Sequence, residues 1–335
     1  MEGKLSYLLR RLAWVPVILF FVSFVTFALA RFGPGDPVRV AAGNFRDEEA
    51  FDRIRAARGL DKPIYEQYYI YMKGVLTEGD FGESYRFRDV KVTEILFPAM
   101  WRSFQYNIVA LAITLAVGLP LGIFAARRQG TWTDPASISF FLLLQSIPLL
   151  VVIPFALLLF ALKLGVLPAS GWPTNNCNVE LSFLGESYQC IGVISDEAII
   201  PVLALAIPGI AIWGRYTRAF TLEVMREDYV RTARSKGLSE YTIMTRHVLR
   251  NAMLPLSTII AFALVGLIEG AFFIETLTGV PGVGRLAFES IGGRDYDMIM
   301  AIVLVGASTF VIASIAIDIA YTVIDPRIRY GSRSG

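Results

Sequence analysis

The residues of this chain that could do chemistry are a few polar side chains set within or beside long apolar runs. Glu269 lies inside one such run, Glu275 lies near its outer end, and Gln145 interrupts an earlier run. Ionisable groups at membrane depth are costly and almost always face a cavity or a partner, although a carboxyl group that only packs helices is the alternative. We expect Glu269 to line a pathway and Glu275 to have a structural or gate role beside Pro281-Gly282. Gln145 could line a pore or bond across helices, and the sequence leaves both open.

Other kinds of chemistry are poorly supported. The chain has one histidine, His247, which nearly excludes histidine-based metal and acid–base clusters. It has no Gly-x4-Gly-Lys-[Ser/Thr] phosphate loop. A membrane enzyme would need a catalytic dyad or a metal set at membrane depth, and we find no convincing pair. We therefore predict that the chain is not an enzyme and binds no metal or cofactor itself.

Residues 229–255, YVRTARSKGLSEYTIMTRHVLRNAMLP, combine basic and apolar side chains at helical spacing. Gly237 suits the left-handed position that ends one short helix, and Ser239 suits the N-cap of a second, with Glu240 near the positive end of its dipole. Pro255 then marks the start of the next apolar run. The sequence predicts a helix–turn–helix elbow whose basic residues are Arg231, Arg234, Lys236, Arg246 and Arg250 and whose apolar residues are Val230, Leu238, Tyr241, Ile243, Met244 and Val248.

The two faces of this elbow need an explanation. An amphipathic helix that binds anionic lipid would also be basic. Such a helix has no need of a glycine turn or of the small residues Thr232, Ala233 and Ser235, which allow a second protein surface to approach closely. We interpret the segment as a docking elbow for a soluble partner.

Composition indicates a membrane protein. The chain has 335 residues, is 55% hydrophobic and 18% charged, and has a mean hydropathy of +0.54. The net charge of +2 is too small to suggest a nucleic-acid partner. The apolar residues form six runs near the roughly 20 residues that cross about 30 Å of hydrocarbon. The predicted spans are approximately 12–30, 106–126, 136–162, 198–214, 256–274 and 298–324.

The distribution of lysine and arginine sets the expected orientation. Basic residues precede the first span and follow the second, fourth and sixth, whereas residues 164–197 have four acidic side chains and no basic one. Both termini are therefore expected in the cytoplasm, and residues 31–105, 164–197 and 275–297 outside. Ala28-Leu29-Ala30 looks like a signal-peptide cleavage site, but the apolar run before it is longer than usual, which favours an uncleaved span.

The outer loop 164–197 contains the only cysteines, Cys177 and Cys190. A disulfide is expected there because that compartment is oxidising, and two unpaired thiols are the alternative. The predicted organisation is a first span in 1–30, an external segment in 31–105 with short amphipathic helices, a core in 106–324 that includes the elbow at 226–250, and a cytoplasmic tail in 325–335.

Several motifs resemble one known family. The run from Tyr229 to Leu238 resembles the EAA loop of binding-protein-dependent ABC importer permeases, in the dipeptide/oligopeptide/nickel branch. Arg231 stands where the general pattern has glutamate, as is usual in that branch. Matching motifs, in order, are Gly79–Ser84, Ser146-Ile147-Pro148, Glu275-Thr276, Pro281–Leu286, Arg294-Asp295-Tyr296 and Asp318–Arg329. Thr278 and Ser314 depart from the pattern.

The resemblance implies an all-α polytopic fold with six transmembrane helices, the type I ABC importer (MetI-like) permease fold with a cytoplasmic coupling helix. It implies a second homologous permease, two cytoplasmic ATP-binding subunits that use ATP and Mg, and an extracytoplasmic binding protein, in the cell membrane. The cargo would be di- or oligopeptides, although nickel chelates and oligosaccharides enter through similar permeases.

The resemblance also implies roles for the elbow, at 229–245, on the ATPase subunit. Five side chains would pack into a groove of the ATPase: Tyr229, Val230, Thr232, Ala233 and Leu238. Gly237 would make the turn, and Arg231, Arg234 and Lys236 would supply polar contacts. An ion-driven secondary transporter is the alternative, and it would have no docking elbow.

Overall fold

The computed structural model describes residues 2–32, 53, 55–56, 59–87, 90–173, 193 and 195–324, with side chains described between residues 10 and 317. Within these ranges the chain is helical, and the strand-like element that it contains is an isolated bridge between Glu83 and Lys91. The prediction of an all-α fold is confirmed for this part of the chain. Cys177 and Cys190 lie outside the described residues.

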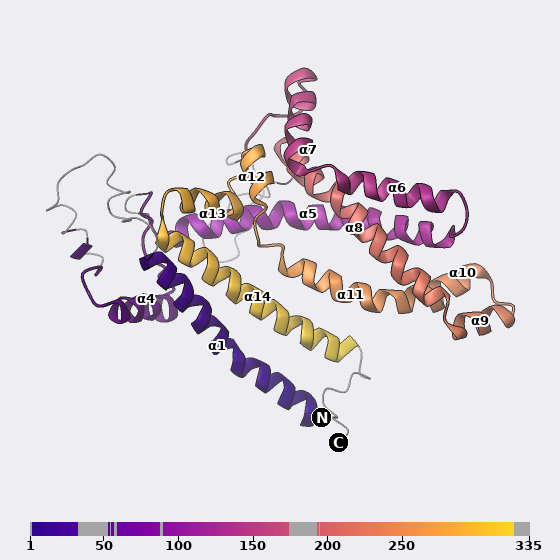
Figure 1. Cartoon of the computed structure of the whole chain (residues 1–335), viewed down its shortest axis with the longest axis horizontal. Coiled ribbons are helices and arrows are strands. Elements are labelled where there is room, and N and C mark those ends of the chain that lie inside the picture. The colour runs from indigo at the N-terminus through magenta and orange to yellow at the C-terminus, as the bar shows by residue number, and fades with distance from the viewer. Residues whose placement is uncertain are drawn as a thin grey trace. The chain divides into compact units, whose positions relative to one another are not determined.

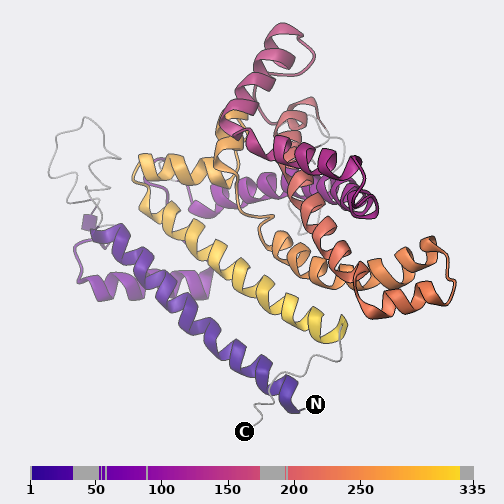
Figure 2. The same cartoon turned by 45° about the vertical axis from the view of Figure 1, so that its right-hand side comes forward.

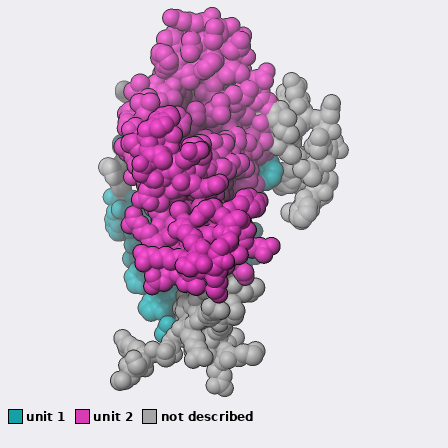
Figure 3. Space-filling model, turned by 90° about the vertical axis from the view of Figure 1, so that its right-hand side faces the viewer, with its two compact units in different colours: residues 1–101, 268–272, 282–335 teal, residues 102–267, 273–281 magenta. Residues whose placement is uncertain are grey.

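The chain divides into two compact units (Figure 3). Unit 1 contains residues 1–101, 268–272 and 282–335, and unit 2 contains residues 102–267 and 273–281. This division differs from the expected boundaries at 30 and 105, because the last helices of the chain pack against the first.

Unit 1 is built around two long helices that lie side by side (Figures 1 and 2). The start of α1 (Glu2–Phe32) and the end of α14 (Tyr296–Ile324) lie at the same end of the unit. Phe27 and Ala30 of α1 are buried against Tyr296 and Met300 of α14. Among its described residues, unit 1 also contains α4 (Ile64–Glu78), the first turns of α5 (Val92–Arg127) and α13 (Val283–Gly292).

The amphipathic helix expected outside the membrane is α4. Tyr68 and Tyr71 pack on the cluster around Phe27, and the hydroxyl groups of Tyr68 and Ser23 lie 2.8 Å apart. Its aromatic face therefore covers part of α1.

Unit 2 contains the rest of α5 and the helices between it and α13. They are α6 (Thr133–Ser146), α7 (Leu149–Ala156), η1 (Leu157–Lys163), η2 (Asp196–Ala198), α8 (Ile199–Met225), α9 (Asp228–Ser235), α10 (Glu240–Thr242), η3 (Ile243–Leu249), α11 (Arg250–Val265) and α12 (Phe272–Thr278).

Small residues let α5 and α8 approach closely. A Cβ atom added to Gly122 would lie 2.5 Å from the carbonyl oxygen of Gly214, and one added to Gly214 would lie 2.7 Å from the ring of Phe141. Membrane helices associate through such small residues because lipid supplies no hydrophobic force to hold them together. α8 therefore packs against both α5 and α6.

Five helices of the described residues are long and apolar enough to cross a membrane, and a bent pair brings the number to six if it forms one span. These helices are residues 10–32, 92–127, 196–225, 240–265 and 296–317, and the bent pair is α6 with α7 and η1. The predicted positions agree, but three boundaries do not. The second and fourth helices are longer than expected because each continues past its apolar run as a helix with polar residues.

The third discrepancy concerns the fifth span, which was expected to start near Pro255 and to include Glu269. α11 instead continues from the elbow through Pro255 without a break and ends at Val265. Glu269 lies at a bend beyond that end. A proline inside a membrane helix is tolerated because neighbouring groups satisfy the freed carbonyl, so it did not mark a helix start.

Candidate functional site

The elbow between α8 and α11 has the turn that the sequence predicted (Figure 1). α9 ends at Ser235, and Gly237 has a φ of +76°, in the left-handed region. Ser239 then caps α10, and its Oγ accepts a hydrogen bond from the backbone N–H of Thr242 at 3.3 Å. The predictions for Gly237 and Ser239 are confirmed.

The inner face of the elbow is a small hydrophobic cluster. Val230 is 0% exposed and Ala233 is 5% exposed, and they pack against Ile243, Met244 and Val248 of the second arm. Neither side chain is therefore available to a partner's groove in this structure, contrary to the expected role. Their helical spacing placed them on the face that holds the two arms together.

The outer face of the elbow keeps apolar and basic groups in solvent. Leu238 is 40% exposed and Tyr241 is 74% exposed. Tyr229 is also exposed, and burial of its hydroxyl group, followed by the charge of Glu227, raises its pKa. The remaining predicted docking residues are exposed as well: Arg231, Thr232, Arg234, Lys236 and Gly237.

One ion pair crosses the turn. Nε of Arg234 lies 2.9 Å from Oε1 of Glu240, so the end of α9 is joined to the start of α10. Both side chains are well exposed, and such surface pairs contribute about 0–1 kcal/mol. The pair orients the turn more than it stabilises it.

Two polar contacts join α6 to α8. Nη1 of Arg215 donates to Oε1 of Gln145 at 2.7 Å, and Nη2 of Arg218 lies 2.6 Å from Oδ1 of Asp134. Gln145 therefore bonds across helices, which was one of its two expected roles. Sequence reasoning did not select Arg215, although a charged residue directly after the fourth apolar run was a signal that could have found it.

The expected gate residue Glu275 is fully buried. Its Oε1 accepts hydrogen bonds from the hydroxyl groups of Ser103, at 2.8 Å, and Tyr106, at 2.7 Å. Glu269, by contrast, is exposed and lies on a different segment, so the two carboxylates do not share one helix. Pro281 is half-buried, and its carbonyl oxygen accepts from Arg102 at 3.4 Å; Gly282 is buried.

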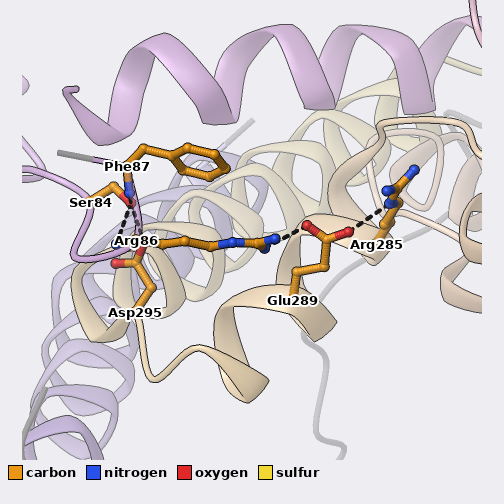
Figure 4. Close-up of polar contacts among 6 residues, drawn as sticks. All are labelled: Ser84, Arg86, Phe87, Arg285, Glu289 and Asp295. Atoms are coloured by element: carbon orange, nitrogen blue, oxygen red, sulfur yellow. Dashed lines mark hydrogen bonds and ion pairs between the residues drawn. The ribbon is translucent and has the colours of Figure 1, made fainter. Parts of the chain in front are cut away.

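In unit 1, two motifs far apart in sequence meet around Asp295 (Figure 4). Asp295 is 1% exposed; it accepts from the hydroxyl group of Ser84 and from the backbone N–H of Tyr85 at 3.1 Å. It also accepts from the N–H of Met298 at the start of α14. Asp295 therefore fixes the loop after α4 to the first turn of α14.

Glu289 of α13 lies between two arginines beside this loop (Figure 4). Its carboxylate oxygens lie 2.6 Å from Nη1 of Arg86 and 2.7 Å from Nε of Arg285. Burial opposes ionisation of Glu289, but hydrogen bonds from Arg285 and Arg86 outweigh it and hold its pKa below the ordinary value. Glu289 thus offsets the positive charges of these two arginines.

This geometry predicts a pH-dependent loss of stability. A carboxyl group whose pKa is lowered on folding stabilises the fold above its unfolded pKa of about 4.3, and that contribution disappears as pH falls through the folded value. We expect Glu289→Gln to lower the unfolding midpoint at neutral pH by an amount typical of about 1 kcal/mol, and the gap to the wild type to close toward about pH 3. Thermal unfolding of the purified protein across this pH range measures the gap.

The control is Glu78→Gln, because Glu78 is exposed at the end of α4 and pairs with no described residue. It should leave the midpoint unchanged at each pH. A difference in unfolding midpoint between Glu289→Gln and the wild type that stays constant with pH would contradict the ion-pair explanation.

Comparison with known proteins agrees with this architecture. Residues 118–330 match the family model described as "Binding-protein-dependent transport system inner membrane component", and residues 4–117 match the model of its N-terminal part. The "Probable peptide ABC transporter permease protein y4tP" of Sinorhizobium fredii is 34% identical over 97% of this chain and 99% of its own length. The "Oligopeptide transport system permease protein OppB" of Haemophilus influenzae is also 34% identical, over 97% of this chain and all of its own.

Among solved structures, the fold is similar to a chain of the methionine ABC transporter MetNI in an inward-facing conformation. The TM-score is 0.52, the identity is 14%, and the match covers 70% of this chain and 97% of the other. This similarity confirms the predicted MetI-like fold. Together with the matches along its full length, it shows that this multi-pass membrane protein belongs to the family of binding-protein-dependent transport system inner membrane components, the pore-forming permease subunits of ABC transporters, which do not hydrolyse ATP themselves.

Proposed function

We propose that this chain is one permease subunit of an ATP-driven importer that carries di- or oligopeptides into the cell. The relatives named for peptide and oligopeptide transport share about a third of its residues over nearly the whole length. Its termini would lie in the cytoplasm, and the cargo would arrive from an extracytoplasmic binding protein. A second, similar permease would complete the path.

The elbow is the observation that carries this proposal. It presents Leu238, Tyr241 and Tyr229 to solvent beside basic side chains, and its inner cluster keeps the two arms together. Exposed apolar and aromatic groups on a well-packed structural element are typical of docking surfaces. A cytoplasmic ATPase subunit is the partner that explains both features, because the chain has no phosphate loop of its own.

The second arm gives the elbow a mechanical role. It is continuous in helix from Glu240 to Val265, so a force on the turn reaches the membrane helix directly. Closure of two ATPase subunits on ATP and Mg would move the elbows and switch the path between inward- and outward-facing states. Gly237, Arg231, Arg234 and Lys236 lie at the contact, while Val230 and Ala233 keep its shape.

The proposal is tested by purifying the tagged chain from its native cells in mild detergent and identifying the proteins that accompany it. A second six-span protein and ATPases with Walker motifs are expected. Leu238→Asp should remove the ATPases, because it places a charge on the exposed turn. The control Leu76→Asp changes a leucine on α4 that is even more exposed than Leu238, and it should retain the ATPases. Absence of ATPases from the wild type, with uptake driven by an ion gradient, would favour a secondary transporter.

A further inference from the structure

The contact between Gln145 and Arg215 lies deep along the membrane helices. Asp134 is in the first turn of α6, and Gln145 follows it by eleven residues, or about 16 Å at 1.5 Å per residue. The hydrocarbon layer is about 30 Å thick. In α8, residues 199–214 have no charged side chain, and Arg215 comes directly after them. Because its guanidinium reaches Oε1 of Gln145, the positive charge lies beside the apolar part of α6, about 16 Å along that helix from its first turn.

The charge of Arg215 has a neutral partner, unlike its neighbour one turn away. Arg218 is paired with Asp134 at 2.6 Å, and both side chains are largely buried. Arg215 is exposed on unit 2, and within the described residues no carboxylate lies at ion-pair distance from it. Charged groups in membrane helices are expensive and face a water-filled path or a partner. Arg215 is therefore an exposed cation whose charge is available to bind an anion.

A broken helix adds a second, independent observation at the same place. α6 ends at Ser146, one residue after Gln145, and α7 begins at Leu149 with a bend of 81°. Ser146, Ile147 and Pro148 are exposed. Irregular backbone at membrane depth occurs where it is buried in protein or lines a water-filled cavity. The helix break at residues 146–148 and Arg215 thus both indicate a water-exposed surface at the same place on unit 2.

We infer that Arg215, positioned by Gln145 beside this break, binds the C-terminal carboxylate of the peptide as it crosses the membrane. This inference rests on the proposed function and adds a site to it. A guanidinium has five N–H donors, and the bond to Gln145 uses one, so a pair remains for two carboxylate oxygens. Gln145 accepts a hydrogen bond from Arg215 and so holds the guanidinium in place. Because the amide is neutral, the positive charge of Arg215 remains available to the peptide carboxylate.

The experiment compares uptake of trialanine with uptake of trialanine amide by the assembled transporter in cells, with the same binding protein throughout. The wild type should import the acid faster than the amide by about tenfold, the value of one charge-assisted interaction. Gln145→Glu puts a carboxylate beside Arg215 and changes the side chain by only one atom. It should remove the difference between the two peptides by lowering uptake of the acid.

Two further variants separate binding from folding. Arg215→Lys keeps the positive charge but loses the paired N–H donors of the guanidinium. It should retain a reduced preference for the acid. Ser146→Ala is the matched control, because its hydroxyl group bonds to the carbonyl of Leu142 and does not touch Arg215. It should keep the full preference.

Three results would overturn the site. The first is a wild type without preference for the acid, and the second is a Gln145→Glu variant that keeps the preference. The third is an equal loss of uptake of both peptides in Gln145→Glu, which would assign Gln145 and Arg215 to helix packing or to contact with the second permease. Failure of the wild type to import either peptide would instead overturn the proposed function, so the two failures are distinguishable.

Discussion

Replacing Gly237 with valine is expected to stop peptide uptake while the chain still folds and reaches the membrane. The backbone at Gly237 has a φ of +76°, which a β-branched residue adopts only at a cost of about 2 kcal/mol. At about 1.4 kcal/mol for each factor of ten, the native turn would become roughly 30-fold less populated. Since the turn sets the angle between the arms, the outer face would no longer match its partner.

The measurement is peptide uptake together with the ATPase activity that the loaded binding protein stimulates, in vesicles that contain the assembled transporter. We expect both to fall by at least about tenfold for Gly237→Val. A Cβ atom at this position would meet no atom within 4 Å, so the strain comes from the backbone and not from crowding.

That property supplies two sharp controls. Gly237→Asn should keep most activity, because asparagine tolerates the left-handed conformation. Gly130 lies in the turn between α5 and α6 with a φ of +79° and equal free space around its Cβ position. Gly130→Val therefore imposes the same backbone strain outside the elbow and should leave coupling intact. Normal uptake by Gly237→Val, or equal losses from both valine variants, would contradict the coupling role of the turn.

Features that depend on local chemistry could be predicted from the sequence. Long apolar runs gave the spans, because insertion in lipid depends on composition over about 20 residues. The glycine turn and the serine cap of the elbow followed from backbone preferences at Gly237 and Ser239. Neither requires knowledge of the rest of the fold.

Features that depend on tertiary packing could not be predicted in the same way. Val230 and Ala233 were expected to pack into a groove of a partner, but only the position of the second arm shows that these side chains are covered. α11 passes through Pro255 because neighbouring structure tolerates the missing N–H. Arg215 and Gln145 are 70 residues apart, and Ser84 and Asp295 are 211 apart, so their contacts needed the fold.

Replacing Glu275 with alanine is expected to destabilise the protein more than any exposed substitution in it. Glu275 is 0% exposed and accepts from Ser103 and Tyr106, both of which are also buried. Its removal takes an acceptor from two hydroxyl groups, at about 1–3 kcal/mol each, and leaves a cavity beside them. The measurement is the unfolding midpoint of the purified protein, which should fall by several degrees.

Glu275→Gln decides between the structural and the gate role of this residue. Glutamine retains an oxygen that accepts from both hydroxyl groups, so the midpoint should remain close to that of the wild type. If Glu275 only holds helices together, uptake by this variant should also persist; if its charge acts in the gate, uptake should fall at unchanged stability. A double variant that combines Glu275→Ala with Tyr106→Phe tests the hydrogen bond itself. It should lose less stability than the sum of the losses of the two single variants, because each of them already removes this hydrogen bond. Strict additivity would show that the contact between Glu275 and Tyr106 contributes nothing to stability.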